Sequence, residues 1–313
     1  MTTTDPAAAP TTKAAAGSAA LAAGITVLAW SSAFVAIRWT GESFSPGSLA
    51  LGRLALGSLA LGAILAARGR WVRPTWPEWR LIVVCGVAWF GVYNVALNAA
   101  EQRVDAGTTA MLVNIGPILI AAFAGLLLGE GFPRWLMVGM AVAFSGALLI
   151  GASTARGSSA DVAGVLLCVV AAVTYAVGVV SQKPVLRRLP ALQVTWLACT
   201  IGAAGCLPFA GRLGSEVPEA SAGHVMGLVY LGLVPTALAF SAWAYALARM
   251  DAGRLGVTTY LVPPITVLMG WLLLGEVPAV LALVGGVVCL VGVGLSRRRT
   301  PTPASTMPGQ PVR

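Results

Sequence analysis

Ten long, mostly apolar stretches follow one another along this chain, and the short segments between them carry most of its charged residues. About 20 such residues are enough for a helix to cross the hydrocarbon core of a bilayer. Helices are the expected spanning form because backbone amides find no water there, and the short alternating segments of a β-barrel are absent. We therefore predict an all-α polytopic membrane protein with ten transmembrane helices. The expected spans are 19–38, 48–67, 80–100, 104–128, 134–152, 161–181, 191–210, 223–246, 254–274 and 278–295.

Composition agrees with a lipid environment and argues against several other classes of protein. Hydrophobic residues make up 58% of the chain and charged residues 10%, whereas soluble domains carry about 25% charged residues. The net charge of +9 does not indicate nucleic-acid binding, because the basic residues lie in short loops. The single histidine, the absence of a CxxC pair and the absence of a Walker sequence indicate no metal, no cofactor and no ATP hydrolysis.

The basic residues predict the orientation, because cytoplasmic loops are rich in lysine and arginine. With the N-terminus in the cytoplasm, 15 of the 20 basic residues fall inside, 4 fall outside and Arg53 lies within a span. We therefore expect a multi-pass protein of the cytoplasmic membrane with both termini inside the cell. Segments 1–17 and 297–313 are predicted to be disordered tails because they are rich in Ala, Thr and Pro or in basic residues.

The chain resembles itself at an offset of 146 residues. Residues 104–107 read VDAG and residues 250–253 read MDAG, while 126–130 and 272–276 both read LLLGE. Pro117 falls on Pro263 at the same offset. An offset of 145 places Trp30 on Tyr175, so the similarity reaches the first span of each half. The chain is therefore predicted to contain two repeats, 18–152 and 153–296.

Each predicted repeat holds five spans, an odd number, so the second repeat must enter the membrane from the opposite side. Inverted repeats of this kind provide a physical basis for alternating access, in which two similar halves rock around a site near the midplane. The order Ala-Gly, Pro, Leu-Gly-Glu, Gly in both halves resembles the EamA-like branch of the drug/metabolite transporter superfamily. That resemblance implies ten helices and secondary transport of small metabolites, commonly export of amino acids or related compounds.

Polar residues within spans are candidates for a transport path, because they are costly in lipid. Asn94, Asn98 and Glu101 are spaced to share one helical face, with Tyr93 beside them. The alternative is that these amides only join neighbouring helices. Asn114 and Tyr260 each precede a proline by three residues, and a proline can bend a helix and free a carbonyl for a substrate. A simple packing kink is the alternative there.

Aromatic and charged residues complete the candidate site. Trp30, Ser32, Tyr175 and Trp243 are predicted to line an aromatic cavity wall, although aromatic residues also form interfacial belts. Arg53 is expected to extend its charge to the outer interface or to anchor a substrate carboxylate. The pair Glu130 and Glu276, with Pro117 and Pro263, is expected to act in helix bending, capping or gating.

The function predicted from these features is export of small metabolites by alternating access, without enzymatic activity. Two alternatives stay open, a membrane enzyme acting on lipid-linked substrates and a membrane subunit that transports nothing itself. The expected partners are a small-molecule substrate and the lipid bilayer, with a homodimer left open and nucleic acid excluded.

Overall fold

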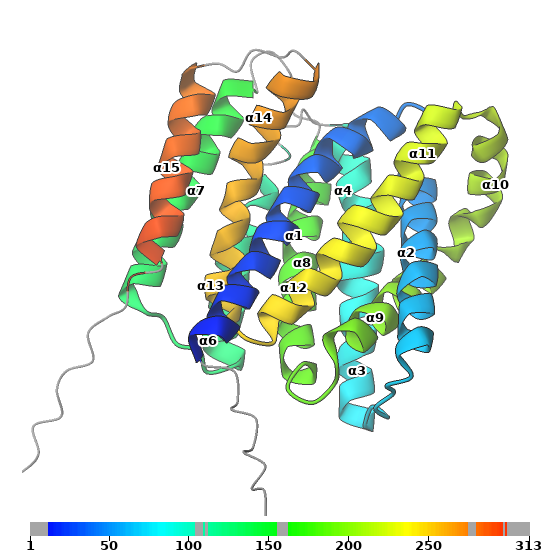
Figure 1. Cartoon of the computed structure of the whole chain (residues 1–313). Coiled ribbons are helices and arrows are strands. Elements are labelled where there is room, and N and C mark those ends of the chain that lie inside the picture. Colours follow the sequence, from blue (N-terminus) through cyan, green and yellow to red (C-terminus); the bar gives the residue numbers. More distant parts are fainter. Residues whose placement is uncertain are drawn as a thin grey trace, which may run out of the picture.

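The protein is a bundle of α-helices (Figure 1). A computed structural model describes residues 12–103, 109, 112–154, 162–274, 280–296 and 298, and this part of the chain contains no strand. The elements of the first half are α1 (Thr12–Thr40), α2 (Pro46–Arg68), α3 (Trp76–Cys85), η1 (Gly86–Val92), α4 (Tyr93–Glu101), α6 (Gly116–Leu127) and α7 (Arg134–Thr154). Those of the second half are α8 (Val162–Val185), α9 (Ala191–Gly205), η2 (Leu207–Phe209), α10 (Ala210–Glu219), α11 (Ala222–Leu231), η3 (Gly232–Leu238), α12 (Ala239–Leu247), α13 (Ala252–Thr258), η4 (Thr259–Leu261), α14 (Val262–Leu274) and α15 (Val280–Ser296).

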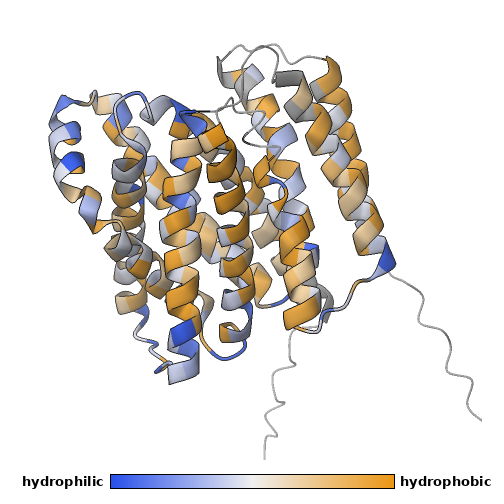
Figure 2. Ribbon diagram, turned by 180° about the vertical axis from the view of Figure 1, so that it is seen from behind, coloured by the Kyte–Doolittle hydropathy of each residue, from blue (hydrophilic) through white to orange (hydrophobic). Residues whose placement is uncertain are grey.

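Many of these helices are long and apolar enough to cross a bilayer. Figure 2 shows hydrophobic residues along the length of the bundle and hydrophilic residues gathered at its two ends. Within the described ranges, five continuous helices meet the length and composition of a span, and a sixth candidate is the pair α9 and η2–α10, which is bent by 51°. Three shorter apolar helices accompany them, Gly116–Leu127, Arg134–Leu149 and Leu283–Ser296. The core therefore lies between helices whose outer faces are suited to lipid.

Two predicted spans are continuous helices with a π-helical segment in the middle. The span Trp76–Glu101 contains η1, and the span Ala222–Leu247 contains η3. Each π-helix is 7 residues long, and their first residues, Gly86 and Gly232, are 146 positions apart. Single-turn π segments occur frequently at functional sites. The sequence analysis predicted these spans but not their irregular centres.

The two π-containing spans run in opposite directions. In Figure 1, α3 begins at the lower end of the bundle and leads up to α4, whereas α11 begins at the upper end and leads down to α12. The start of α1 and the end of α15 both lie at the lower end. Helix α1 begins at Thr12, inside the segment that the sequence predicted to be a tail.

The seventh predicted span is shorter than expected, and a helix takes the place of the loop after it. Helix α9 ends at Gly205, and α10 follows at an angle. An i,i+4 ion pair forms on α10 between Arg212 and Glu216, with Nε and Oε1 2.9 Å apart. Glu216 Oε2 also accepts a hydrogen bond of 3.0 Å from the backbone N–H of Ser45, immediately before α2. These contacts explain why a polar segment is helical and folded back onto the bundle.

Helices α7 and α15 pack with their backbones in direct contact. A Cβ atom on Gly292 of α15 would lie 2.3 Å from the backbone nitrogen of Ala143 on α7. Gly139 and Gly146 meet α15 in the same way, with an added Cβ 2.6 Å or less from backbone atoms of α15. Small residues allow membrane helices to approach this closely. This contact ties the end of the chain to its first half.

Gly292→Ala should destabilise the protein, because the added methyl group must push two backbones apart. Overpacking of this kind costs about 1–3 kcal/mol. Gly294→Ala is the matched control, because an added Cβ there meets nothing within 4 Å. Thermal unfolding of both variants in detergent checks the prediction. Equal midpoints for the two variants would show that the α7–α15 contact is looser than the structure indicates.

Candidate functional site

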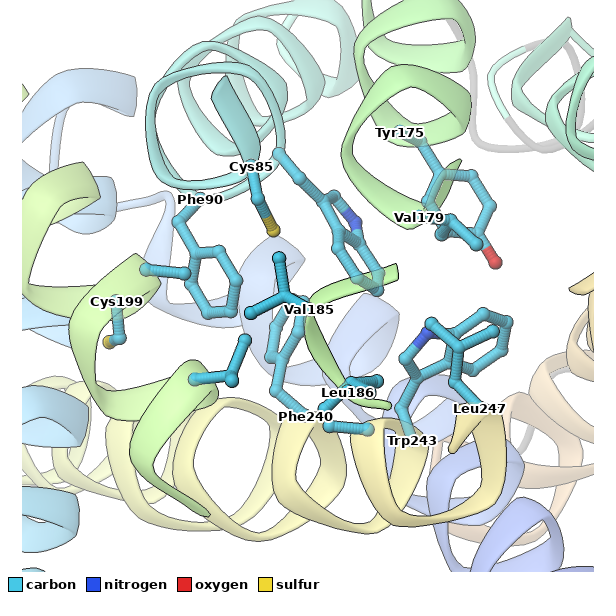
Figure 3. Close-up of a cluster of buried hydrophobic side chains, with 14 of the residues drawn as sticks. Cys85, Phe90, Tyr175, Val179, Val185, Leu186, Cys199, Phe240, Trp243 and Leu247 are labelled. Carbon is cyan, nitrogen blue, oxygen red and sulfur yellow. The ribbon is translucent and has the colours of Figure 1, made fainter. Parts of the chain in front are cut away.

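Seven aromatic residues pack together where α1, η1, α4, α8 and α12 meet, and we call them the aromatic cluster. Its ring centroids lie close together, at 4.4 Å for Phe90–Phe240 and 5.1 Å for Trp30–Trp243. Most pairs are edge-to-face or tilted, the favourable geometries for aromatic rings. Figure 3 shows Tyr175 and Trp243 facing each other across the cluster. The members are Trp30, Trp89, Phe90, Tyr93, Tyr175, Phe240 and Trp243.

Trp30 joins the aromatic cluster to the π-helix η3. Its indole Nε1 donates a hydrogen bond of 3.3 Å to the backbone carbonyl of Pro235. Pro235 has no backbone N–H to give to the preceding turn. The neighbouring Thr236 hydroxyl donates instead to the carbonyl of Leu231, at 2.8 Å. Two side chains thus bond to backbone carbonyls of this irregular segment, and one of them, Trp30, belongs to the aromatic cluster.

Several buried polar atoms around the aromatic cluster have no hydrogen-bond partner in the part of the chain that the structure describes. They include Nε1 of Trp243 in the cluster and, seven residues after Tyr175 on α8, both amide atoms of Gln182. The Tyr175 hydroxyl has Thr259 beside it but forms no hydrogen bond of regular geometry. Buried polar groups in native proteins are nearly always hydrogen-bonded. These atoms are therefore candidates for contact with a bound solute.

The polar stripe predicted on the third span is present on α4 and mostly buried. Asn94 Nδ2 donates to the Phe90 carbonyl at 2.8 Å, within η1, and Asn98 Nδ2 donates to the Pro46 carbonyl at 3.1 Å. Their Oδ1 atoms, with Oε1 of Glu101, are buried without a partner among the described residues. Asn98 therefore joins α4 to the start of α2, Asn94 bonds back to its own span, and both keep an unused acceptor.

Arg53 does not extend outward, and the expectation that it reaches the outer interface is wrong. The residue is 4% exposed, and its Nε donates a hydrogen bond of 3.0 Å to the Thr236 hydroxyl of η3. Glu101 lies within electrostatic range of both Arg53 and Arg38. Helix α2 packs closely on η3 because Gly57 leaves room for the Thr236 side chain, and this contact brings Thr236 within reach of Arg53.

Asn114 and Tyr260 meet each other rather than the aromatic cluster. The Tyr260 hydroxyl donates to the Asn114 carbonyl at 3.0 Å, and its ring packs against Phe144. Pro117 and Pro263 stand in the first turn of α6 and α14, so each proline opens a helix after a break. The Asn114 carbonyl, three residues before Pro117, therefore accepts from Tyr260, and a role of these two residues toward a substrate stays a prediction.

Ser32 and Glu130 lie away from the aromatic cluster. The Ser32 hydroxyl pairs with the Tyr230 hydroxyl at 2.7 Å, near the outer face of the bundle. Glu130 caps α13, accepting from the backbone N–H groups of Ala252 and Gly253 at 2.8 and 3.2 Å. Capping was among the expected roles of this residue. Its counterpart Glu276 lies outside the described residues.

Lys183 holds the same turn from the other side, a role that the sequence analysis missed. Its Nζ donates to the Leu247 carbonyl at 2.6 Å and also to the Met250 carbonyl. The Lys183 cation lies at the partially negative end of α12, and the Glu130 anion lies at the partially positive start of α13. Both arrangements are favourable. In the sequence, Lys183 is marked by the repeat, because a second basic residue, Arg38, stands at the equivalent position 145 residues earlier.

The chemistry available at these sites is binding by apolar walls, hydrogen bonds and charge. All five cysteines are buried and free, and no group of three or more metal-ligating residues occurs among the described residues. Four residues of the candidate site were not predicted, namely Trp89, Phe90, Phe240 and Thr236. The repeat gave no signal for them, because at the offset of 146 Trp89 falls on Pro235 and Phe90 on Thr236.

Comparison with known proteins identifies the family. The model of the EamA-like transporter family matches residues 17–152 and again 162–298. The chain belongs to the EamA-like transporter family. The resemblance noted in the sequence is thereby confirmed, and the protein is a polytopic membrane protein of a transporter family. The two matches divide the chain close to the predicted boundary between its halves.

The chain is similar to several transporters over most of its length. It is 36% identical to the "Probable terminal-alkyne amino-acid exporter" of Streptantibioticus cattleyicolor over 276 residues, 88% of this chain and 92% of the other. It is 33% identical to an uncharacterised transporter of Bacillus subtilis over 84% of this chain and 86% of the other. A crystal structure at 21% identity shares the fold, with a TM-score of 0.75 over 90% of this chain and 96% of that one.

Replacing the Glu130 carboxylate should weaken the start of α13 without affecting membrane insertion. In Glu130→Gln one of two capping bonds and the negative charge are lost, at a cost of about 1 kcal/mol. Thermal unfolding in detergent measures the effect. Glu219→Gln, at the exposed end of α10, is the control. A midpoint for Glu130→Gln as high as that of the control would contradict the capping role.

Proposed function

We propose that this protein is a secondary transporter that exports small metabolites, namely amino acids or related compounds, across the cytoplasmic membrane. Two relatives support this class of substrate through their names, the exporter of S. cattleyicolor and a "Probable amino-acid metabolite efflux pump" of Salmonella typhimurium that is 24% identical over 67% of this chain and 75% of the other. Family membership supports transport itself. The site supports it through its buried aromatic cluster with unpartnered polar atoms.

The mechanism that we propose is alternating access between two inverted five-helix repeats. The observation that carries it is that repeat-equivalent residues touch each other. Trp30 and Tyr175, at the offset of 145, have ring centroids 6.3 Å apart. Tyr260 and Asn114, and Cys289 and Ala143, are hydrogen-bonded pairs separated by 146 residues. A residue can meet its own equivalent only near a twofold axis, and the opposite directions of η1 and η3 spans agree with such an axis in the membrane plane.

The proposed axis passes beside the aromatic cluster, which places the cluster where two rocking halves would both contact a solute. The aromatic cluster draws residues from both halves, with Trp30 and Trp89 from the first and Tyr175 and Trp243 from the second. A solute bound there would meet side chains that move relative to each other. That is the location expected of a substrate site in an inverted-repeat transporter.

Transport is tested with purified protein in liposomes, by counterflow of labelled amino acids, nucleobases and polyamines. We expect flux of amino acids above that of protein-free liposomes, and little flux of the other two classes. Trp243→Phe should lower the flux about threefold or more, because it removes an unpartnered indole N–H while keeping an apolar ring. Trp71→Phe, 49% exposed at a span end, is the matched control.

The absence of flux for every solute, with folded protein, would refute transport as the function. Equal flux in Trp243→Phe and Trp71→Phe would remove Trp243 from the solute path while leaving transport intact. Gel filtration and the thermal midpoint report folding in each case.

We further propose that both termini face the cytoplasm. All five native cysteines are buried, so introduced cysteines can be labelled selectively in intact cells. Gly214→Cys on α10 should react with a membrane-impermeant maleimide in intact cells, since an added Cβ there meets nothing within 4 Å. Arg70→Cys, at an exposed position after α2, should react only after permeabilisation. The reverse pattern would show the opposite orientation.

A further inference from the structure

We propose that Arg53 and Glu101 form a head-group site for a zwitterion, so that the transporter selects α-amino acids over the corresponding amines and carboxylic acids. This inference rests on the proposed function and names the residues that would recognise the substrate. It is carried by two ionisable side chains on helices that pack against each other, Arg53 on α2 and Glu101 on α4, which are also joined by the hydrogen bond from Asn98 to the Pro46 carbonyl. Both keep unused hydrogen-bonding capacity among the described residues.

The positive side of the site is oriented but incompletely bonded. The Arg53 side chain is nearly fully buried, and Thr236 fixes its Nε. Within the described part of the chain the guanidinium forms no other hydrogen bond, so its terminal N–H groups are available. A guanidinium presents donors in a planar fork that matches a carboxylate. Arg53 is therefore suited to receive the substrate carboxylate in a fixed orientation.

The negative side of the site lies on α4. Glu101 Oε1 and Asn98 Oδ1 are both buried without a partner among the described residues, and they are three positions apart on one helical face. An ammonium group carries three donors and no acceptor. A charged and a neutral acceptor one turn apart can take two of its N–H groups. An isolated carboxylate here would otherwise be poorly solvated.

Charge balance distinguishes a zwitterion from other solutes. An α-amino acid brings a carboxylate to Arg53 and an ammonium group to Glu101, and it adds no net charge to a buried region. An amine would leave the Arg53 cation without a carboxylate, and a carboxylic acid would leave Glu101 without an ammonium group. Leaving one charge of a buried pair unmatched is strongly unfavourable. The pair therefore acts as a filter for molecules that carry both groups.

Tyr93 connects the proposed head-group site to the aromatic cluster. Its ring lies 5.9 Å from that of Tyr175, and its hydroxyl is within electrostatic range of both Arg53 and Glu101. A head group held between the two charges would thus have the aromatic cluster next to it. Apolar and aromatic side chains are favoured there, because the aromatic cluster presents ring faces and edges to them.

Three probes that differ only in the head group test this inference. They are phenylalanine, phenethylamine, which lacks the carboxylate, and 3-phenylpropanoate, which lacks the amine. Binding is measured by the shift of the thermal midpoint in detergent, and transport by counterflow in liposomes. For the wild-type protein we expect phenylalanine to be preferred about tenfold or more over each of the other probes in both measurements.

The variants should change the preference rather than only the rate. Glu101→Gln should lose most of the phenylalanine preference over 3-phenylpropanoate, and Arg53→Gln most of the preference over phenethylamine. Arg53→Lys keeps the charge and should keep the preference, with weaker binding because the fork is lost. Glu42→Gln, a carboxylate on a side chain that is 71% exposed between α1 and α2, is the matched control.

Each outcome separates the inference from the proposed function. Phenylalanine flux with the same preferences in all folded variants would overturn the head-group site and leave transport standing. Binding of phenylalanine with the expected change of preference, but without counterflow, would support the head-group site and refute transport. Equal binding of all three probes by the wild-type protein would overturn the inference directly.

Discussion

Hydrocarbon offers no hydrogen bonds, so every break in a membrane helix has to be repaired by the protein itself. The break at Pro235 is the one on which this site depends. Thr236 repairs it by donating to the Leu231 carbonyl, and the same hydroxyl accepts from Arg53. The Pro235 carbonyl is taken by Trp30. A local defect in one helix thereby fixes both the buried cation and the centre of the aromatic cluster. A regular helix at this position would leave neither side chain with its partner.

The proposed repeats share a scaffold but not a site. The π-helices η1 and η3 have equal lengths and stand at equivalent positions of the two halves. Even so, the position that is Trp89 in η1 is Pro235 in η3. Arg53 falls on Cys199 and Trp30 on Tyr175. The features that form the proposed path of motion are thus duplicated, whereas the residues that would contact a substrate differ between halves. Such a division lets two halves exchange roles mechanically while a single asymmetric solute is bound in one orientation.

Features that extend over many residues could be predicted from the sequence. Apolar length predicted ten spans, of which five or six appear as candidates among the described residues, and the offset of 146 predicted the two halves. The sequence did not reveal the π-helices, because one extra residue per turn leaves the hydropathy of a span unchanged. It misjudged Arg53 because depth in a span does not say whether a side chain faces lipid or a neighbouring helix such as η3. It did not reveal that Tyr260 bonds to the Asn114 carbonyl, because a contact between residues 146 positions apart is not visible in the sequence.

The two ends of the protein are not equivalent in this structure, although the repeat pairs them. Lys183 binds the carbonyls of Leu247 and Met250, and Glu130 caps the helix that follows. Arg38, the counterpart of Lys183, is exposed, and its charge interacts with Glu101 at a distance. Under alternating access, Lys183 would have to release its carbonyls when that end opens, and water would have to replace them. The two cations thus differ in their contacts, and under the proposed mechanism the bonds of Lys183 would belong to the state in which the end where α12 meets α13 is closed.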